Sequence, residues 1–179
     1  MNEFPENLWA PWRIEYIQLL RDESRSGCFL CDYRDAPEND AKNHVVWRAN
    51  NTMVVLNRYP YTNGHMLIAP LAHKEDLDDL DDSEMAALWW QTRDAKALLA
   101  RALEPHGFNV GINVGRCAGA GLPGHLHIHV VPRWNGDTNF MAVLGDVRVI
   151  PQSLERLHER LQDLTAEMGL PRRPGEGET

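Results

Sequence analysis

The chain is short of cysteine and of positive charge, and it lacks any long hydrophobic run. Its three cysteines are too few for a disulfide framework and fit a reducing compartment. No apolar stretch approaches the ~20 residues that a membrane-spanning helix needs. Eighteen lysines and arginines against 26 acidic residues leave a formal net charge of −8, the wrong sign for wrapping a nucleic-acid backbone. We therefore expect neither a membrane nor a nucleic-acid partner, whereas a small anion bound at one local site is compatible with this charge.

Length and composition indicate a single globular domain. At 179 residues the chain is long enough for one substantial core and too short for two domains of ordinary size. The hydrophobic share of 43% and the charged share of 25% are ordinary for such a domain. The first residues carry neither the basic segment nor the apolar core of a secretory signal. We expect one cytoplasmic domain over residues 1–179, with an aromatic N-terminal arm at 1–24 and a loose tail at 170–179.

The most informative segment is H-L-H-I-H-V-V-P-R, which runs from His125 to Arg133. Alternate side chains of a β-strand share a face, so its three histidines should form one row opposite Leu126, Ile128 and Val130. Imidazole acts near neutral pH as nucleophile, general acid or metal ligand, and the row is therefore predicted to be functional. The alternative is a solvated strand face. The isolated histidines expected at the surface are His44, His106 and His158.

Hydrophobic periodicity predicts the fold class. Strands are expected where apolar residues alternate or cluster, at residues 45–47, 52–56, 65–69, 108–114 and 125–133. Asp81 followed by Glu84 forms a capping box that starts a long helix, which Pro105 ends. The predicted buried stripe of that helix is Met85, Leu88, Trp89, Thr92, Leu99 and Leu103. Ser153 caps a C-terminal helix. These elements predict an α+β fold, in which an antiparallel sheet of about five strands carries the long helix and the C-terminal helix.

A glycine-rich loop at residues 115–124 directly precedes the histidine row. One interpretation is a catalytic zinc held by three imidazoles with an open water position. The other is an imidazole that attacks phosphorus while backbone N–H groups of the loop hold the phosphate oxygens. Same-face neighbours in a strand lie ~7 Å apart, which makes capture of one ion by all three histidines awkward. The loop and this spacing favour the nucleophile.

The chain resembles the histidine triad (HIT) superfamily. The signature of alternating histidines followed by small apolar residues is matched by H-L-H-I-H-V-V-P. The upstream V-V-L-N-R-Y-P-Y-T-N-G-H-M-L-I-A-P-L-A-H is similar to the strand, loop and strand of that family. The segments W-A-P-W-R, F-N-V-G-I-N-V-G and H-V-V-P-R-W-N-G-D-T-N-F are most similar to the diadenosine tetraphosphate phosphorylase and hydrolase (Fhit-like) branch. The resemblance covers Cys28 to about Trp134.

The resemblance implies roles for the site residues. His127 would attack the α-phosphorus of a nucleotide, His129 would contact the phosphate oxygens, and His65 would stand near the same phosphate. The implied substrate-binding residues are Asn57, Asn113, Gly119, Ala120, Gly121 and His129. The expected activity is cleavage of dinucleoside polyphosphates, or other AMP conjugates, through a covalent nucleotidyl-histidine intermediate. Alternatives are a nucleoside phosphoramidase and a nucleotide-binding sensor with slow turnover.

The loop before the triad departs from both branches of the family. Fhit-related hydrolases carry a glutamine there and the phosphorylases a glycine-serine pair, whereas this chain has Ala120 and Gly121. Neither an amide nor a hydroxyl is therefore supplied at this point. Water and inorganic phosphate both stay open as acceptors of the nucleotide.

A second expected site is a structural zinc ion. Cys28 and Cys31 form a C-x-x-C pair, and several HIT proteins combine such a pair with two histidines, which match His73 and His125 here. Two sulfurs and two nitrogens make a closed zinc site. The alternative is a reduced cysteine pair packed under the sheet. Cys117 stands alone and is interpreted as packing or incidental.

The family resemblance also implies a homodimer with a continuous sheet across two subunits. The aromatic arm carries Trp9 and Trp12, which are typical interface anchors. A five-stranded antiparallel layer leaves an edge open, and a twofold contact would close it. We therefore expect self-association.

Overall fold

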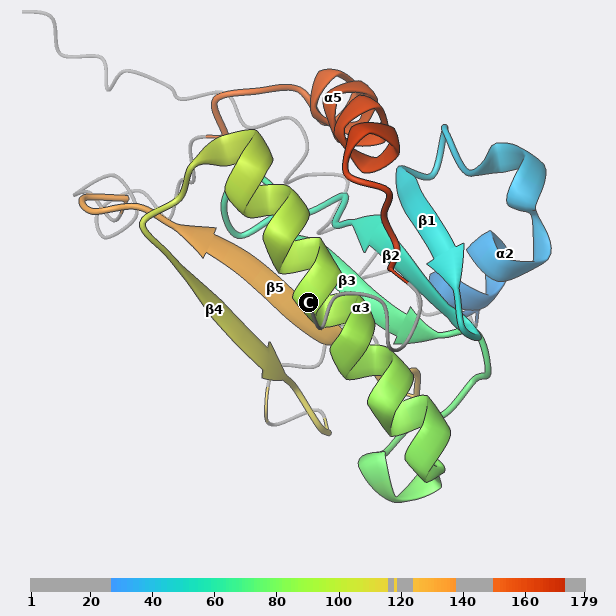
Figure 1. Cartoon of the computed structure of the whole chain (residues 1–179). Helices are drawn as coiled ribbons and strands as arrows, with labels where there is room; N and C mark the ends of the chain where they lie inside the picture. Colours follow the sequence, from blue (N-terminus) through green and yellow to red (C-terminus); the bar gives the residue numbers. More distant parts are fainter. Residues whose placement is uncertain (1–26, 116–117, 119–123, 138–149, 173–179) are drawn as a thin grey trace, which may run out of the picture.

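The computed structural model describes residues 27–115, 118, 124–137 and 150–172. It confirms the α+β class, with one five-stranded antiparallel sheet in the order β1-β2-β3-β5-β4 (Figure 1). The elements are α2 (Phe29–Asp35), η1 (Pro37–Asn39), β1 (Val45–Ala49), β2 (Thr52–Leu56), β3 (Met66–Pro70), η2 (Leu77–Asp79), α3 (Asp82–Leu103), β4 (Gly107–Ile112), β5 (Ile128–Arg133) and α5 (Leu154–Glu167). Among the described helices, none is both long and apolar enough to cross a membrane. The expected aromatic arm lies outside the described residues.

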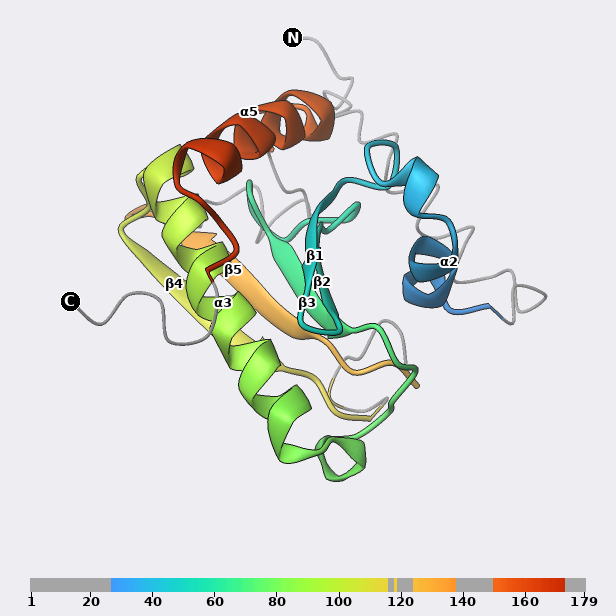
Figure 2. The same cartoon turned by 45° about the vertical axis from the view of Figure 1, so that its right-hand side comes forward.

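Helices cover both faces of the sheet (Figure 2). On one face, α3 and α5 pack against Val54 and Leu56 of β2 in the main core. On the other face, Met53 and Val55 of the same strand pack with Leu30 of α2. Successive side chains of a strand point to opposite faces, so a strand covered on both sides must be apolar throughout. This is why T-M-V-V-L is buried at every position.

The histidine segment runs into β5, an interior strand of the sheet. β5 pairs with β3 on one side and β4 on the other. The predicted alternation is confirmed, because Leu126, Ile128 and Val130 all lie in the core beneath α3. The predicted strand boundary is wrong, because β5 begins at Ile128 and only the third histidine of the row lies within it. The residues before Ile128 lie outside the ladder of hydrogen bonds that β5 forms with its two neighbours.

The long helix begins as predicted. Asp81 accepts a hydrogen bond from the backbone N–H of Glu84, whose side chain bonds back to the cap. One member of the predicted stripe is wrong, because Trp89 is 50% exposed. Consecutive helical residues point about 100° apart, so Trp89 falls on the flank of a buried face that is centred on Leu88 and Ala95. A three-four spacing alone does not define how wide the covered face is.

Two polar contacts at the C-terminal end differ from expectation. His158, expected at the surface, is buried on α5, and its Nε2 donates to the carbonyl oxygen of Val45 at 2.9 Å. The buried carboxylate of Asp94 accepts hydrogen bonds from the backbone N–H and the guanidinium of Arg172, both at 2.8 Å. Residues 170–172 of the segment expected as a loose tail are therefore bound to α3 at Arg172.

The loop between β2 and β3 is held close to α3 by a glycine. Gly64 has φ +79°, and a Cβ atom at this position would lie 2.4 Å from Leu103 Cδ1 and 3.0 Å from Leu99 Cδ2. A side chain at this position would meet both backbone strain and a clash with the core. The absence of a side chain therefore allows the loop to reach the helix and present the following residue, His65, to the sheet.

Gly64→Ala is expected to destabilise the fold more than Gly136→Ala. Gly136 has the same φ of +79°, but a Cβ atom at that position would have nothing within 4 Å. Gly136→Ala is the control, and backbone strain should lower its free energy of unfolding by ~1–2 kcal/mol. In Gly64→Ala, overpacking should lower the free energy of unfolding by a further ~1–3 kcal/mol. Urea unfolding of the two variants and the wild type measures the difference. Equal losses would show that the contact with Leu99 and Leu103 is relieved at no cost.

Candidate active site and metal-binding cluster

The structure brings five predicted site residues together around β5. His65 precedes β3 and its Nε2 lies 2.9 Å from His129 Nδ1. The ring centroids of His127 and His129 are 4.8 Å apart. Asn57, directly after β2, lies 3.2 Å from His65 Nδ1, and Asn113, directly after β4, lies 3.4 Å from His129 Nε2. Three segments of the chain, namely the β2–β3 loop, the end of β4 and the histidine segment, thus meet at one point of the sheet.

The backbone determines which nitrogen of His127 is free. Its Nδ1 lies 2.9 Å from the carbonyl oxygen of His125, and because a carbonyl oxygen only accepts hydrogen bonds, Nδ1 must carry the proton. Burial lowers the pKa of His127, which keeps the ring neutral near pH 7. A neutral ring with its proton on Nδ1 has a lone pair on Nε2. This is the state in which an imidazole is nucleophilic.

His129 is also kept uncharged. Burial, and to a smaller degree the proximity of His127, lower the pKa of His129 to about 4. A phosphate group bound here would therefore meet neutral imidazoles that offer directed lone pairs and N–H groups rather than positive charges.

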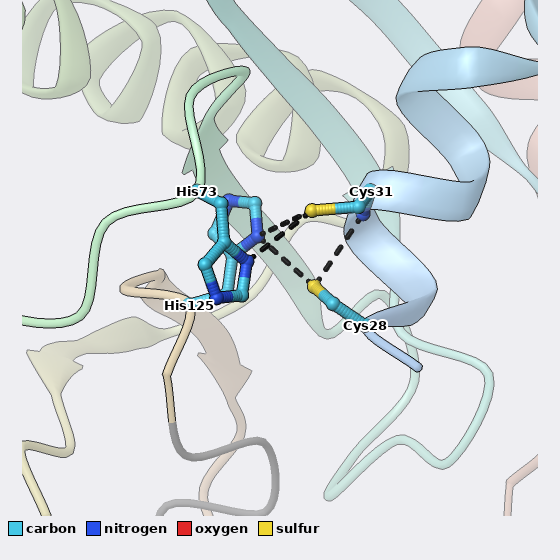
Figure 3. A group of neighbouring side chains, drawn as sticks. All are labelled: Cys28, Cys31, His73 and His125. Carbon is cyan, nitrogen blue, oxygen red and sulfur yellow. Dashed lines mark hydrogen bonds between the residues drawn. The ribbon is translucent and has the colours of Figure 1, made fainter. Parts of the chain in front are cut away.

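Four side chains form a separate cluster on the α2 side of the sheet (Figure 3). The sulfur of Cys28 lies 3.0 Å from His125 Nδ1, and the sulfur of Cys31 lies 3.2 Å from His73 Nδ1. One donor atom from each of the four residues lies within 4.8 Å of every other. Cys28 precedes α2 as its N-cap, so the first turn of that helix brings the two sulfurs to the same place. The predicted ligand set is thus assembled.

The donors of this cluster are arranged as a metal would require. His125 Nε2 donates to the carbonyl oxygen of Pro70 at 2.9 Å, which leaves the Nδ1 lone pair directed at the sulfurs. Burial raises the pKa of the Cys28 thiol to about 11, so a bound cation would be needed to favour its thiolate. Two thiols and two imidazoles therefore fit a tetrahedral metal ion.

The row of three histidines is divided between two sites. His125 belongs to the cysteine cluster, whereas His127 and His129 face His65. Within the described parts of the chain, the group of possible metal ligands that lies close together is the two-cysteine, two-histidine set. This division speaks against a catalytic metal bound by all three triad histidines.

Sequence reasoning missed one residue of the active-site cluster. The ring of Tyr61 lies 4.5 Å from that of His65 and stacks on His129 at 5.8 Å, while 42% of the residue is exposed. Its only sequence signal is its place in the R-Y-P-Y-T-N-G-H loop. Arg133, the last residue of β5, has a structural role instead. Its guanidinium pairs with Asp137 and donates a hydrogen bond to Asn109.

Three predicted phosphate-site residues, Gly119, Ala120 and Gly121, lie outside the described residues, as does Cys117. Their expected roles stay predictions.

The comparisons with known proteins agree with this geometry. The family model described as "HIT domain" matches residues 38–136. The AP-4-A phosphorylase of Mycobacterium tuberculosis is 40% identical over 153 residues, which cover 83% of this chain and 78% of that protein.

Two solved structures extend the comparison. A Zn-bound histidine triad family protein from Mycobacterium smegmatis has a TM-score of 0.64 and 28% identity, covering 80% of this chain and 96% of that one. The NitFhit protein of Caenorhabditis elegans has a TM-score of 0.56 and 27% identity, covering 68% of this chain and 27% of that one. With its family model, its sequence relatives and its fold in agreement, the chain belongs to the HIT family.

Proposed function

We propose that the chain cleaves dinucleoside polyphosphates by transferring a nucleotidyl group to His127 and then to inorganic phosphate. The observation that carries this proposal is the hydrogen bond from His127 Nδ1 to the His125 carbonyl oxygen, which leaves Nε2 free to attack. His129 stands beside it as a partner for phosphate oxygens, and His65 contacts His129 from behind. The chain is a HIT-family nucleotide hydrolase or phosphorylase, and its identity to an AP-4-A phosphorylase supports the choice of substrate.

The first step would form a covalent intermediate. The lone pair on His127 Nε2 attacks the α-phosphorus, the N–P bond forms, and the bridging P–O bond breaks. The leaving polyphosphate takes the electron pair of that bond. The proton on Nδ1 stays shared with the His125 carbonyl, which stabilises the positive charge that the ring gains as it becomes phosphorylated.

The second step would release the nucleotide. An oxygen of the acceptor attacks the same phosphorus, the N–P bond breaks, and the electron pair returns to His127 Nε2. Phosphate as acceptor yields a nucleoside diphosphate, and water yields a nucleoside monophosphate. The name of the mycobacterial relative favours phosphate, while Ala120 and Gly121 provide no side chain that selects between the two.

Product analysis with diadenosine tetraphosphate tests the function. In phosphate buffer we expect ADP and ATP in equal amounts, because the adenylyl group on His127 passes to phosphate. His127→Ala should lower turnover at least ~1,000-fold and keep measurable nucleotide binding, since catalysis and ground-state binding are different free energies. Chromatography and calorimetry measure the two quantities.

Other outcomes of that assay identify the alternatives. AMP as the sole product at saturating phosphate would make water the acceptor and overturn the phosphorylase assignment. Turnover of an adenosine phosphoramidate alone would indicate a phosphoramidase. Tight nucleotide binding without turnover of either substrate would indicate a sensor, and near wild-type turnover in His127→Ala would remove the covalent mechanism.

We also propose that Cys28, Cys31, His73 and His125 bind a structural zinc ion. The support is the mutual distance of their donor atoms and the Zn-bound structural relative from Mycobacterium smegmatis. A zinc ion there would join α2 to the loop that follows β3 and to the start of the triad. Its coordinate bonds would cross-link these segments and so stabilise the fold, which is the usual role of a closed site.

Metal analysis tests the zinc site. The purified protein should contain one zinc per chain, and Cys28→Ser should lose the metal and lower Tm by ~5 °C or more, about 2 kcal/mol for a domain of this size. Cys117→Ser is the control, because Cys117 is the remaining cysteine and should not affect zinc content. Protein purified without chelator that contains no zinc would contradict the proposal.

We further propose that the chain forms a homodimer through β4. This strand is at one end of the sheet, and no described strand pairs with its outer edge. Val110 of β4 is 41% exposed, and Trp89 on α3 is 50% exposed. An open edge beside exposed apolar side chains is a surface that natural proteins cover.

Light scattering tests the dimer. The wild type should have twice the chain mass at micromolar concentration, and Val110→Lys should shift it toward the monomer, because a lysine on an edge strand opposes pairing. The control is Glu38→Lys, which also introduces a lysine but at an exposed position of η1, near the β1 end of the sheet. It should leave the mass unchanged. A monomeric wild type would overturn the proposal.

A further inference from the structure

His65 is a buried histidine whose two ring nitrogens both have partners. It is 0% exposed and directly precedes β3. Its Nδ1 lies 3.1 Å from the backbone N–H of Tyr61 and 3.2 Å from the side-chain nitrogen of Asn57. Its Nε2 lies 2.9 Å from His129 Nδ1. Because histidine carries one proton on either nitrogen when neutral, these contacts determine where that proton lies.

Both groups facing His65 Nδ1 are donors. A backbone N–H has no alternative, so Nδ1 must accept from Tyr61 and cannot itself be protonated. The amide of Asn57 is oriented by its other end, because its Oδ1 accepts from the backbone N–H of Tyr59 at 2.9 Å. The nitrogen of that amide is thereby the end that faces His65. The single proton of His65 must be on Nε2.

That proton determines the state of His129. His65 Nε2 donates it to His129 Nδ1, which must accept and cannot be protonated. His129 is neutral, because burial lowers its pKa to about 4, so its own proton is on Nε2. The side-chain amide of Asn113, 3.4 Å from His129 Nε2, is compatible with this state, because it can turn by 180° and present its oxygen. The backbone of Tyr61 cannot turn in this way.

We propose that His65, fixed by Asn57 and the backbone of Tyr61, is a positioning residue that holds His129 as a neutral imidazole with its proton on Nε2. His129 is then a hydrogen-bond donor to an oxygen of the phosphoryl group attacked by His127. This inference rests on the proposed nucleotidyl transfer. In the opposite tautomer, a lone pair on His129 Nε2 would face the phosphate oxygens and repel them. The ring of Tyr61, stacked on His129, helps to hold its plane.

The neighbouring rings of His127 and His129 thus have opposite tautomers, because an acceptor faces Nδ1 of the first and a donor faces Nδ1 of the second. His127 has its proton on Nδ1 because a carbonyl oxygen accepts it, and it offers a lone pair at Nε2. His129 has its proton on Nε2 because a donor occupies Nδ1, and it offers an N–H. A phosphoryl group needs both, namely a nucleophile at phosphorus and a donor at oxygen. Asn57, which family resemblance assigns to substrate binding, has here a second role in orienting His65.

Nitrogen NMR of the whole, substrate-free protein tests the tautomers directly. In ¹⁵N-histidine-labelled wild type at pH 7, His65 and His129 should each be protonated at Nε2 alone, and His127 at Nδ1 alone. Single replacements of each histidine assign the signals. A His129 that is protonated mainly at Nδ1, or a doubly protonated His65, would overturn the proposal. Because this measurement uses no substrate, it stands even if the proposed activity fails.

A matched pair of variants tests the consequence for catalysis. His65→Gln places an amide nitrogen where Nε2 was, and His65→Leu removes the donor while keeping an apolar side chain of similar size. With diadenosine tetraphosphate we expect kcat to fall at least ~10-fold in His65→Leu and to stay within ~3-fold of wild type in His65→Gln, because the donor at His129 Nδ1 is then restored. The His129 tautomer should be mixed in the leucine variant only. Equal kcat values for the two variants, or an unchanged His129 tautomer in His65→Leu, would overturn the positioning role.

Discussion

The hydrogen bond from His127 Nδ1 to the carbonyl oxygen of His125 is the interaction on which the two sites of this protein depend. The same residue, His125, supplies its backbone carbonyl to His127 and its side chain to the cysteine cluster. Its ring is in turn held by the carbonyl oxygen of Pro70 at the end of β3. Any displacement of the cluster would therefore move the group that orients His127. The proposed zinc ion would stabilise the nucleophile's position without touching the substrate.

The surroundings of the site explain why its imidazoles remain neutral. His65 and His127 lie within the fold, with 0% and 7% of their surfaces exposed. Burial disfavours the charged forms of His127 and His129, and the hydrogen-bonding partners then select one of two neutral tautomers. The partners that select the tautomer are mostly backbone groups. The N–H of Tyr61 does so for His65, and the carbonyl oxygen of His125 does so for His127. Backbone groups cannot change their donor or acceptor character, so the protonation pattern is a property of the fold.

The loop between β2 and β3 supplies two residues of the candidate site, Asn57 and His65. It begins at Asn57 and ends at His65, and the hydroxyl of Thr62 bonds the carbonyl oxygen of Pro132 on β5 at 2.9 Å. Gly64 lets the loop lie against Leu99 and Leu103 of α3. The loop therefore contacts both β5 and α3. This attachment keeps His65 in line with His129 without help from substrate.

Much of the fold could be predicted because the responsible signals are local. The capping box at Asp81 and the alternation at Leu126 and Ile128 depend on neighbours in sequence. The wrong predictions have the opposite character. Trp89 is exposed because it lies on the flank of the helix face that packs on the sheet, and His158 is buried because β1 provides a carbonyl oxygen for it. Both depend on segments that pack from elsewhere in the chain.

For the candidate site, the sequence by itself determined which residue types are available and that they alternate along one strand. It also presented the C-x-x-C pair as a ligand source, and family resemblance added His73 as a partner. Only the tertiary structure separated His125 from His127 and His129, placed Tyr61 on the imidazoles, and assigned a proton to each ring. The physical reason is that a tautomer depends on the atom facing each nitrogen. Those atoms belong to strands and loops that folding alone brings together.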